Sequence, residues 1–202
     1  MKQLKFLDDL IQCFEKLPGV GHKTALRYAY YIVEKYNLDD IKKVCKVMLE
    51  TFTNIQKCEV CGMLTTEHIC DICSDPSRDS KKIHVVKDPK DLLNIEKSGE
   101  FNGKYHVLGG LISAFERVKP EDLNIENLEK RVYNDPVEEV IIATSLTPSG
   151  EITALYIESL LQAKSNLKIS RIGYGLPAGS DLEYADDLTI KRALEYRVTK
   201  TK

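Results

Sequence analysis

The sequence predicts an α+β protein built from several modules: an N-terminal pair of short helices, a four-cysteine module, an α/β domain with a parallel sheet, and a C-terminal helical segment. Three observations predict this order. Apolar residues recur at helical spacing in the first quarter of the chain, four of the six cysteines fall within sixteen residues, and short apolar runs then alternate with helical patterns. The expected boundaries are 1–54, 55–79, 80–176 and 177–202.

Composition and charge limit the classes of protein to which the chain can belong. It has 202 residues, of which 43% are hydrophobic, enough to bury a core. The N-terminal stretch MKQLKFLDDLIQCFEK is amphipathic and interrupted by charges, so we expect no signal peptide, no membrane span and a cytoplasmic location. The net charge is −2, but residues 1–57 carry 10 Lys/Arg against 7 Asp/Glu, a net charge of +3. A polyanionic partner is therefore expected first at the N-terminal end.

Two short helices are expected before residue 37. The first ends at Leu17-Pro18-Gly19 and is indicated by apolar residues at helical spacing, which are Leu4, Leu7, Leu10, Ile11 and Phe14. Gly19 and Gly21 are expected to be required, because a side chain at either position would obstruct an approaching nucleic-acid backbone or forbid the turn. Unpaired backbone amides at the start of the second helix, with the helix dipole behind them, favour a phosphate.

Lys23 and Arg27 lie four residues apart, so they share one face of the second helix just behind the turn. We expect them to contact adjacent phosphates without reading any base. An ordinary helical hairpin with two solvated cations would show the same spacing. The combination of Pro-Gly-x-Gly, a basic pair and an apolar frame favours DNA, since the segment resembles the helix-hairpin-helix motif of DNA repair proteins, which contacts the sugar-phosphate backbone.

A third helix is expected from an apolar stripe that consists of Ile41, Val44, Cys45, Met48, Leu49 and Phe52. Cys45 lies on that stripe, and Cys13 lies beside the apolar face of the first helix. Both cysteines are predicted to be small buried hydrophobic residues rather than reactive thiols.

The stretch C-E-V-C-G-M-L-T-T-E-H-I-C-D-I-C contains two Cys-x-x-Cys pairs separated by eight residues. Each pair can wrap a tight turn and aim two sulfurs at one ion, so the spacing predicts one structural Zn²⁺ per chain, bound by Cys58, Cys61, Cys70 and Cys73. Two disulfides or four unrelated thiols are the alternatives, which the clustering and the absence of a secretory segment disfavour. His68 could replace one cysteine, but four thiolates already close the site and leave no position for a catalytic water.

The α/β domain is expected after a polar linker that ends near residue 79. Strands are expected in four apolar runs, at residues 83–86, 105–108, 140–143 and 169–172. Functional side chains of a parallel sheet belong at the carboxyl ends of its strands. Here these ends are Lys87-Asp88, Gly109-Gly110 and Thr144 to Glu151.

A turn and the start of the last helix are expected between Gly179 and Asp186, with Ser180 or Asp181 as the helix cap. The helix that follows is expected to be an assembly or docking surface, and its apolar residues are Leu188, Ile190, Ala193, Leu194 and Val198. No Gly-x-x-x-x-Gly-Lys-Thr phosphate loop is present in the sequence, so ATP binding is not expected.

The chain resembles the RecR family of bacterial recombination proteins along essentially its whole length. The resemblance lies in the combination and order of its segments, which are LPGVGHKTA, the four cysteines, YHVLGGLIS, EDLNI, GEITALYI and LPAGSDLEYAD. The resemblance implies a Toprim α/β domain and a C-terminal segment that helps protomers associate. It also implies a homo-tetramer or dimer that encircles DNA and acts with RecO and RecF to load RecA on gapped DNA, without being an enzyme.

Enzymes with a Toprim fold place a Glu after the first strand and an Asp-x-Asp after a later one, and these acids hold Mg²⁺. In this chain Lys87 stands where the Glu is expected, Asp88 is beside it, and Glu151 is the one remaining acid after the later strand. A lysine competes with the ion, so a magnesium site is not expected. Asp88 and Glu151 are candidate partner-binding residues, or else solvated loop carboxylates.

Three functions are consistent with these patterns. The first is a non-enzymatic, sequence-independent DNA clamp in recombinational repair, with Gly19, Gly21, Lys23 and Arg27 as DNA-binding residues. The second is a Mg²⁺-dependent Toprim nuclease or primase. The third is a zinc-stapled interaction adaptor that does not bind DNA.

Overall fold

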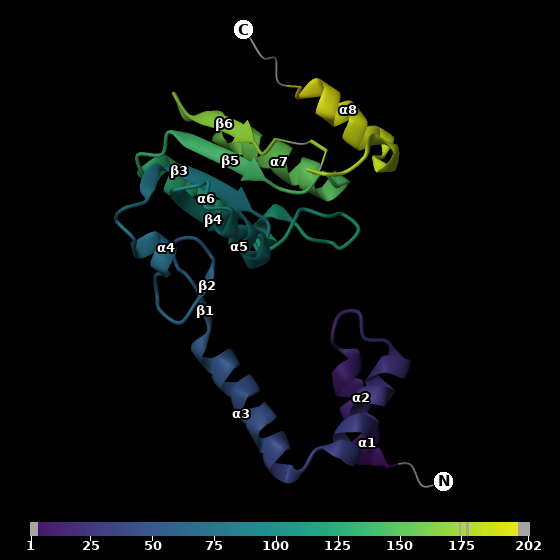
Figure 1. Ribbon diagram of the computed structural model, residues 1–202. Coiled ribbons are helices and arrows are strands. Elements are labelled where there is room, and N and C mark those ends of the chain that lie inside the picture. The colour runs from purple at the N-terminus through teal and green to yellow at the C-terminus, as the bar shows by residue number, and fades with distance from the viewer. Residues whose placement is uncertain (1–3, 174, 177, 198–202) are drawn as a thin grey trace. The chain divides into compact units, whose positions relative to one another are not determined.

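The structure is a computed structural model that describes residues 4–173, 175–176 and 178–197. The chain divides into two compact units, Met1–Asn54 and Ile55–Lys202 (Figure 1). Within the described residues, none of the helices combines the length and the apolar character that crossing a bilayer requires.

The first unit is helical and contains α1 (Lys5–Glu15), α2 (His22–Lys35) and α3 (Leu38–Asn54). Helices α1 and α2 form an antiparallel hairpin whose centre is Ile11, Ala25 and Ala29, all buried. The two alanines lie four residues apart on one face of α2, and their small side chains let α1 approach closely. Partly buried neighbours complete this small core, and they are Leu7, Leu10, Phe14 and Val20.

Helix α3 has no buried residue among those the structure describes, although its apolar stripe has the predicted spacing. Met48 is 66% exposed and Phe52 is 87% exposed. Cys13 and Cys45 are exposed as well, so the prediction that both are buried is wrong. Helical spacing identifies an apolar face but not what packs against it, and no described element of the first unit buries the apolar face of α3.

The second unit begins with the cysteine module, residues 55–78. It contains the short antiparallel strands β1 (Gln56–Lys57) and β2 (Leu64–Thr65), followed by α4 (Asp71–Ser74). The turns that carry the four cysteines lie at the end of β1 and at the start of α4. The side chains of Met63 and Ile72 leave this module and pack against the larger domain.

The α/β domain has a four-stranded sheet in the order β4-β3-β5-β6, with all neighbouring pairs parallel, which confirms the predicted parallel sheet. In chain order its elements are β3 (Asp79–Val86), α5 (Pro89–Ser98), β4 (Gly103–Val107), a 3-10 turn (Pro120–Asp122), α6 (Ile125–Asn134), β5 (Glu139–Ala143), α7 (Pro148–Leu161) and β6 (Lys168–Arg171).

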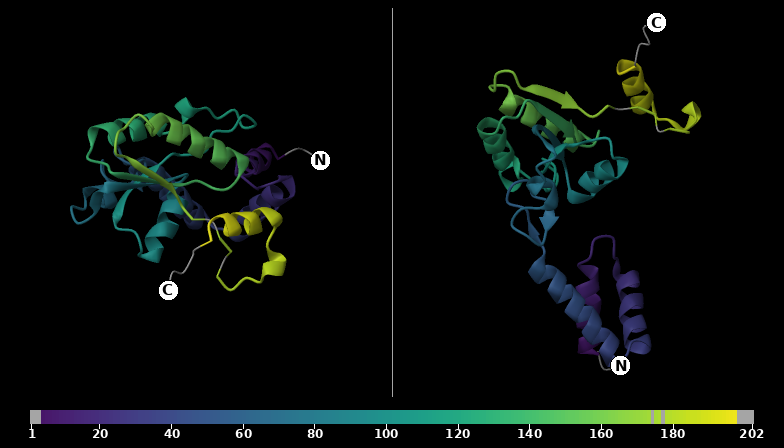
Figure 2. Two further views of the ribbon diagram at one scale, coloured as in Figure 1. Left: turned by 90° about the horizontal axis from the view of Figure 1, so that it is seen from above. Right: turned by 60° about the vertical axis from the view of Figure 1, so that its left-hand side comes forward.

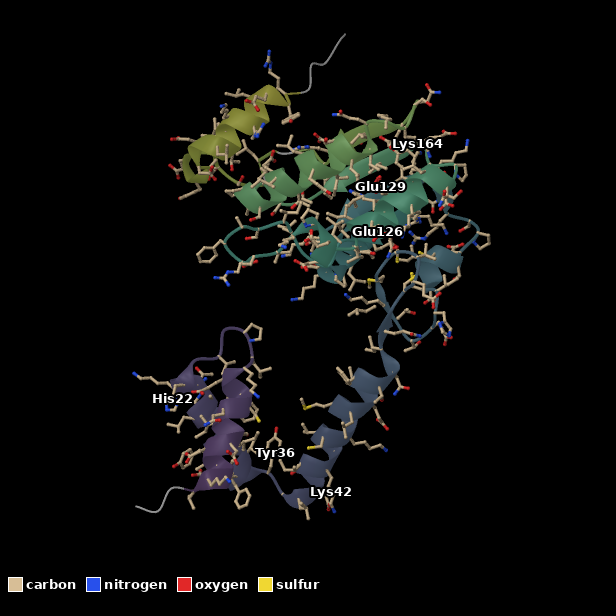
Figure 3. The ribbon with its side chains drawn as sticks, turned by 180° about the vertical axis from the view of Figure 1, so that it is seen from behind. His22, Tyr36, Lys42, Glu126, Glu129 and Lys164 are labelled. Atoms are coloured by element: carbon tan, nitrogen blue, oxygen red, sulfur yellow. The ribbon has the colours of Figure 1, made fainter. Side chains whose placement is uncertain are left out.

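Helices cover both faces of this sheet, with α6 and α7 on one side and α5 on the other (Figure 2). Side chains alternate along β3, so Ile83 and Val85 pack under α6 and α7 while Val86 packs towards α5. Lys164, labelled in Figure 3, follows α7 and donates to the carbonyl oxygens of Val132 and Asp135, which ties the end of α7 to the end of α6.

The two sides of the sheet follow from the direction of its connections. The crossover from β3 to β4 runs one way along the sheet, and the crossovers from β4 to β5 and from β5 to β6 run the other way. Right-handed crossovers then place α5 on the opposite face from α6 and α7. The strand order reverses between β3 and β5, so the chain segments that follow these two strands turn to opposite faces of the sheet. Parallel sheets of this kind bind ligands at the carboxyl ends of the strands beside such a reversal.

The C-terminal part contains a 3-10 turn (Leu182–Tyr184) and α8 (Asp187–Glu195). Asp186, not Ser180 or Asp181, caps α8, because its carboxylate accepts from the Thr189 amide and the Thr189 hydroxyl, both at 2.9 Å. The predicted cap is therefore wrong, since the 3-10 turn delays the start of the helix. Val198 lies outside the described residues.

Candidate metal centre and nucleic-acid interface

A tight turn between α1 and α2, here called the glycine elbow (residues 17–22), forms the first candidate site. The Val20 amide donates to the Leu17 carbonyl at 3.1 Å, and Gly19 adopts a φ of 79°. That left-handed conformation is costly for any residue with a Cβ, so the turn itself requires Gly19.

Gly21 is different, because its φ of −82° and ψ of 167° are open to any residue. A Cβ built on Gly21 would meet no described atom within 4 Å. Steric fit within the protein therefore does not require glycine here, although glycine is a favourable N-cap residue. That Gly21 allows the close approach of a nucleic-acid backbone stays a prediction.

The start of α2 presents backbone amides and cationic side chains together. Gly21 is the N-cap residue, and no side chain among the described residues caps the helix there. Lys23 and Arg27 are both exposed, and the guanidinium of Arg27 lies 5.6 Å from the ring centre of Tyr28. His22, labelled in Figure 3 at the elbow end of the helix, has its Nδ1 2.6 Å from a carboxylate oxygen of Glu15.

The second candidate site is the cluster of Cys58, Cys61, Cys70 and Cys73, whose four sulfurs all lie within 4.8 Å of one another. The Sγ atoms of Cys61 and Cys70 are 3.6 Å apart, too far for a disulfide bond of about 2 Å. Four sulfurs around a zinc ion at Zn–S distances of about 2.3 Å lie about 3.8 Å apart. The cluster therefore has the dimensions of a tetrahedral four-cysteine centre, in agreement with the predicted ligand set.

Local backbone structure aims these sulfurs inward. The Cys58 amide donates to the Met63 carbonyl at 2.7 Å, and Gly62 closes the turn with a φ of 76°. Two amides point at sulfur, from Met63 to Cys61 at 3.4 Å and from Cys70 to Cys58 at 3.3 Å. Such amide contacts orient and stabilise thiolate ligands.

The electrostatics of the cluster favour a bound cation. Burial opposes ionisation of Cys58, but backbone amides, that of Cys70 foremost, outweigh it and lower the pKa of this thiol to about 7. Burial raises the pKa of Cys70 to about 11, and the hydrogen bond with Cys73, followed by burial, raises the pKa of Cys61. Further thiolates therefore need a compensating positive charge, which a divalent metal ion supplies.

His68 does not belong to this cluster. Its side chain is 80% exposed and its Nδ1 lies 3.0 Å from a carboxylate oxygen of Glu59. In the part of the chain that the structure describes, the four cysteines are the one group of three or more metal-ligating side chains close enough to share an ion.

Asp88 lies at the carboxyl end of β3 and caps α5. Its carboxylate accepts from the amides of Lys90 and Asp91 at 2.9 and 3.1 Å, and the Lys87 ammonium is 3.4 Å away. Partial burial opposes ionisation, but the two amides and Lys87 outweigh it and lower the pKa of Asp88. The acid that sequence reasoning singled out thus has a structural role as a helix cap.

Glu151 lies in the first turn of α7 and is paired with Arg171 at the end of β6, with 2.7 Å between Oε2 and the guanidinium. Arg171 also donates to Glu158 at 2.6 Å, and this second carboxylate is the larger cause of the raised pKa of Arg171. Sequence reasoning missed Arg171, because no local pattern connects it to an acid twenty residues earlier.

A cleft of about 570 Å³ lies within the second unit, between the cysteine module and the carboxyl ends of β3 and β4. Its lining includes Lys57 and Glu59 from the module, Asp88 after β3, and Asn124 and Asn127 near the start of α6. The two asparagines were not predicted as site residues. Their position beside the cleft depends on the crossover from β4 to β5, which no local motif indicates.

Comparison with known proteins matches family models to four segments of the chain. Matching family models are the RecR helix-hairpin-helix at residues 7–42, the RecR four-cysteine zinc finger domain at residues 55–75, the Toprim domain at residues 81–173 and the RecR C-terminal model at residues 175–198.

Curated relatives with the same printed description, recombination protein RecR, match over nearly the whole chain. The protein of Lactobacillus acidophilus is 44% identical over 191 residues, which are 94% of this chain and 95% of the relative. The proteins of Latilactobacillus sakei and Pediococcus pentosaceus are each 44% identical, over 188 and 189 residues, which are 93% of this chain and 94% of each relative. The order of helical hairpin, four-cysteine module and Toprim sheet agrees with these matches, and the chain belongs to the RecR family of recombination proteins.

Proposed function

We propose that the protein is a non-enzymatic mediator of recombinational DNA repair that binds DNA without sequence preference. The observation that carries the proposal is the N-terminal end of α2. The glycine elbow lies there, no described side chain caps the helix, and Lys23 and Arg27 are exposed beside it. Amides at a helix N-terminus and two cations on one helix face bind phosphates and read no bases.

We infer different tasks for the two glycines. Gly19 makes the turn, and Gly21 leaves room for a DNA backbone to reach the amides behind it. Lys23 and Arg27 then contact phosphates along the backbone. Release of counterions makes such binding strongly dependent on salt.

We further propose that the metal of the four-cysteine centre is zinc and that its role is structural. Zinc cross-links the two Cys-x-x-Cys turns, and the four ligands leave no open coordination position for a water. Sulfur spacing, burial and amide contacts to sulfur support this assignment.

The proposal that the protein is not an enzyme is supported by the carboxyl edge of the Toprim sheet. Asp88 caps a helix beside Lys87, and Glu151 is neutralised by Arg171. A Mg²⁺-dependent nuclease or primase needs acids that converge on an ion. If the purified protein cleaved or extended DNA with Mg²⁺, and Glu151→Ala abolished that activity, the enzymatic alternative would replace this account.

Assembly and partners belong to the same proposal. The apolar side chains of α3 that the rest of the first unit leaves exposed support association into a dimer or tetramer that clamps DNA. Asp88 and Glu151 at the sheet edge, together with the cleft beside Asp88, are proposed as the surface for partner proteins. The partners that the family resemblance implies are RecO and RecF, with loading of RecA on gapped DNA as the outcome.

Binding of labelled oligonucleotides tests the proposed function. Fluorescence anisotropy with duplex, single-stranded and gapped DNA of two unrelated sequences should give affinities that differ little between sequences and fall steeply from about 50 to 200 mM salt. Binding that is absent at low salt on all three substrates would support the zinc-stapled adaptor instead. Strong preference for one sequence would contradict backbone recognition.

A further inference from the structure

Strand β4 lies at the edge of the Toprim sheet, with β3 on one side only. The backbone groups on its other side belong to alternate residues, Gly103, Tyr105 and Val107, as the two-residue period of a strand requires. Arg78 donates to the Gly103 carbonyl at 3.2 Å, and Arg131 donates to the Tyr105 carbonyl at 2.7 Å. Side chains therefore bind two carbonyl groups of this edge, in the place where a further strand would pair.

The cysteine module binds the amide at the last position of this edge. The Val107 amide donates to the carbonyl of Cys61 at 2.7 Å. A Cβ on Gly62 would lie 2.9 Å from the Val107 carbonyl oxygen, so the turn that carries Cys61 lies directly against the strand. An uncovered edge strand pairs readily with other chains, which makes this cover important for the folded protein.

Lys104 makes the second connection from β4 to the module. Its side chain is buried, with 7% of the residue exposed, and its ammonium donates to three carbonyl oxygens. These oxygens belong to Ile72, Cys73 and Asp75, at 2.9, 3.2 and 2.6 Å. Lys104 thus places a buried positive charge on the segment that carries the metal ligand Cys73.

We propose that Lys104 is a positioning residue for the metal centre and couples it to the edge of the Toprim sheet. Metal binding fixes the two Cys-x-x-Cys turns so that the Cys61 carbonyl meets Val107 and the Cys73 segment meets Lys104. Because the coupling is reciprocal, the same contacts strengthen metal binding. The inference rests on the proposed zinc, but it does not depend on DNA binding.

If Lys104 only filled space between β4 and the cysteine module, its ammonium group would not be needed. Lys104→Met keeps an unbranched stem of similar length but removes the donors, which leaves three buried carbonyl oxygens without this partner. Loss of a hydrogen-bond partner that orients a metal ligand typically lowers metal affinity about 10- to 100-fold, and Lys104 holds the backbone of Cys73 in this way. Lys104→Arg keeps a cationic donor and should restore most of the affinity.

Competition with a chromogenic chelator measures the effect on the full-length zinc-loaded protein. Lys104→Met is expected to weaken zinc binding roughly tenfold or more, whereas Lys82→Met, at a half-exposed lysine of β3 that pairs with Asp79 at 3.3 Å, should bind zinc as the wild type does. Wild-type affinity in Lys104→Met, or equal losses in both variants, would overturn the proposal. If the native protein contained no zinc, the proposal that zinc occupies the four-cysteine centre would be wrong, and the role of Lys104 would fall with it.

Hydrogen exchange on the wild-type protein provides a test that needs no variant, should Lys104→Met fail to fold. Removal of zinc is expected to lower protection of the Val107 amide roughly tenfold or more, while amides of the central strand β5 (Glu139–Ala143) keep theirs. Unchanged protection at Val107 would overturn the coupling. Equal loss at Val107 and along β5 would also overturn it, since that pattern is global unfolding.

Discussion

Arg171, at the end of β6, is held 2.7 Å from the carboxylate of Glu151 in the first turn of α7. The pair occupies the carboxyl edge of the Toprim sheet, and the side chains of both residues are largely buried, with 20% and 28% exposed. Glu151 therefore acts first as a counter-charge that fastens α7 to β6. Its role in the fold is separate from any role in binding a partner.

Glu151→Gln is expected to lower the free energy of unfolding by about 1 kcal/mol, because one charged hydrogen bond to Arg171 is weakened while Glu158 keeps the other. Urea denaturation followed by circular dichroism measures this change. DNA affinity should stay at the wild-type value. A loss of DNA binding with no loss of stability would contradict the structural role.

His84 on β3 predicts how stability depends on pH. It is buried against Phe101 and Tyr105, and neither ring nitrogen has a hydrogen-bond partner among the described residues. Burial lowers the pKa of His84 to about 4, from an ordinary value of 6.5. The unfolded chain therefore binds this proton more readily, and stability should fall as the pH drops from about 6.5 towards 4.

His84→Leu should reduce this acid sensitivity by on the order of 1–3 kcal/mol between about pH 7 and pH 4. The measurement is the free energy of unfolding from urea titrations at several pH values. Burial also lowers the pKa of His106 to about 4, so part of the slope should remain. His22→Leu, in the other unit, is the control, and an equal effect of both variants would refute the assignment.

Thiol accessibility tests the division of the six cysteines. Cys13 and Cys45 are exposed, whereas three of the four clustered cysteines are buried and the fourth, Cys73, is half-buried. In the metal-loaded protein a thiol reagent should react rapidly with Cys13, outside the cluster, while the four clustered thiols stay protected until a chelator removes the metal. Rapid reaction of all six before chelation would contradict a closed metal centre.

The two glycines of the elbow should separate folding from binding. Gly19→Ala is expected to lower stability by about 1 kcal/mol, because alanine tolerates a φ of 79° poorly. Gly21→Ser should change stability by less than about 0.5 kcal/mol, because serine is at least as good an N-cap residue as glycine. It should still weaken DNA binding several-fold if the backbone of DNA approaches there. Denaturation and anisotropy on the same samples distinguish these outcomes. Wild-type DNA affinity in Gly21→Ser would contradict a close approach of DNA at this position.

Local patterns predicted the parts of this molecule that depend on neighbours in sequence. The spacing of the four cysteines predicted a cluster that the structure brings together, and the apolar run at residues 140–143 predicted a strand of a parallel sheet. The position of Lys23 and Arg27 on one exposed face of α2 follows from their spacing of four.

Contacts between distant segments could not be predicted in this way. Lys104 reaches carbonyl groups about thirty residues earlier, and Arg171 pairs with Glu151 across a crossover. The spacing of Cys45 was that of a buried position, but what covers a helix face depends on tertiary or quaternary structure, so Cys45 is exposed. The two missed contacts and the wrong prediction for Cys45 share one cause. A single sequence shows which face of an element is apolar, but not which distant segment packs against it.

The most direct test of the account is the DNA affinity of the double variant Lys23→Ala/Arg27→Ala beside Lys42→Ala/Lys46→Ala, which removes two exposed lysines of α3. Anisotropy over a range of salt concentrations should show the first variant binding roughly tenfold more weakly, with a salt slope lower by about two, and the second binding nearly as the wild type does. Unchanged affinity and slope in the first variant, with its oligomer intact, would contradict DNA binding through the glycine elbow.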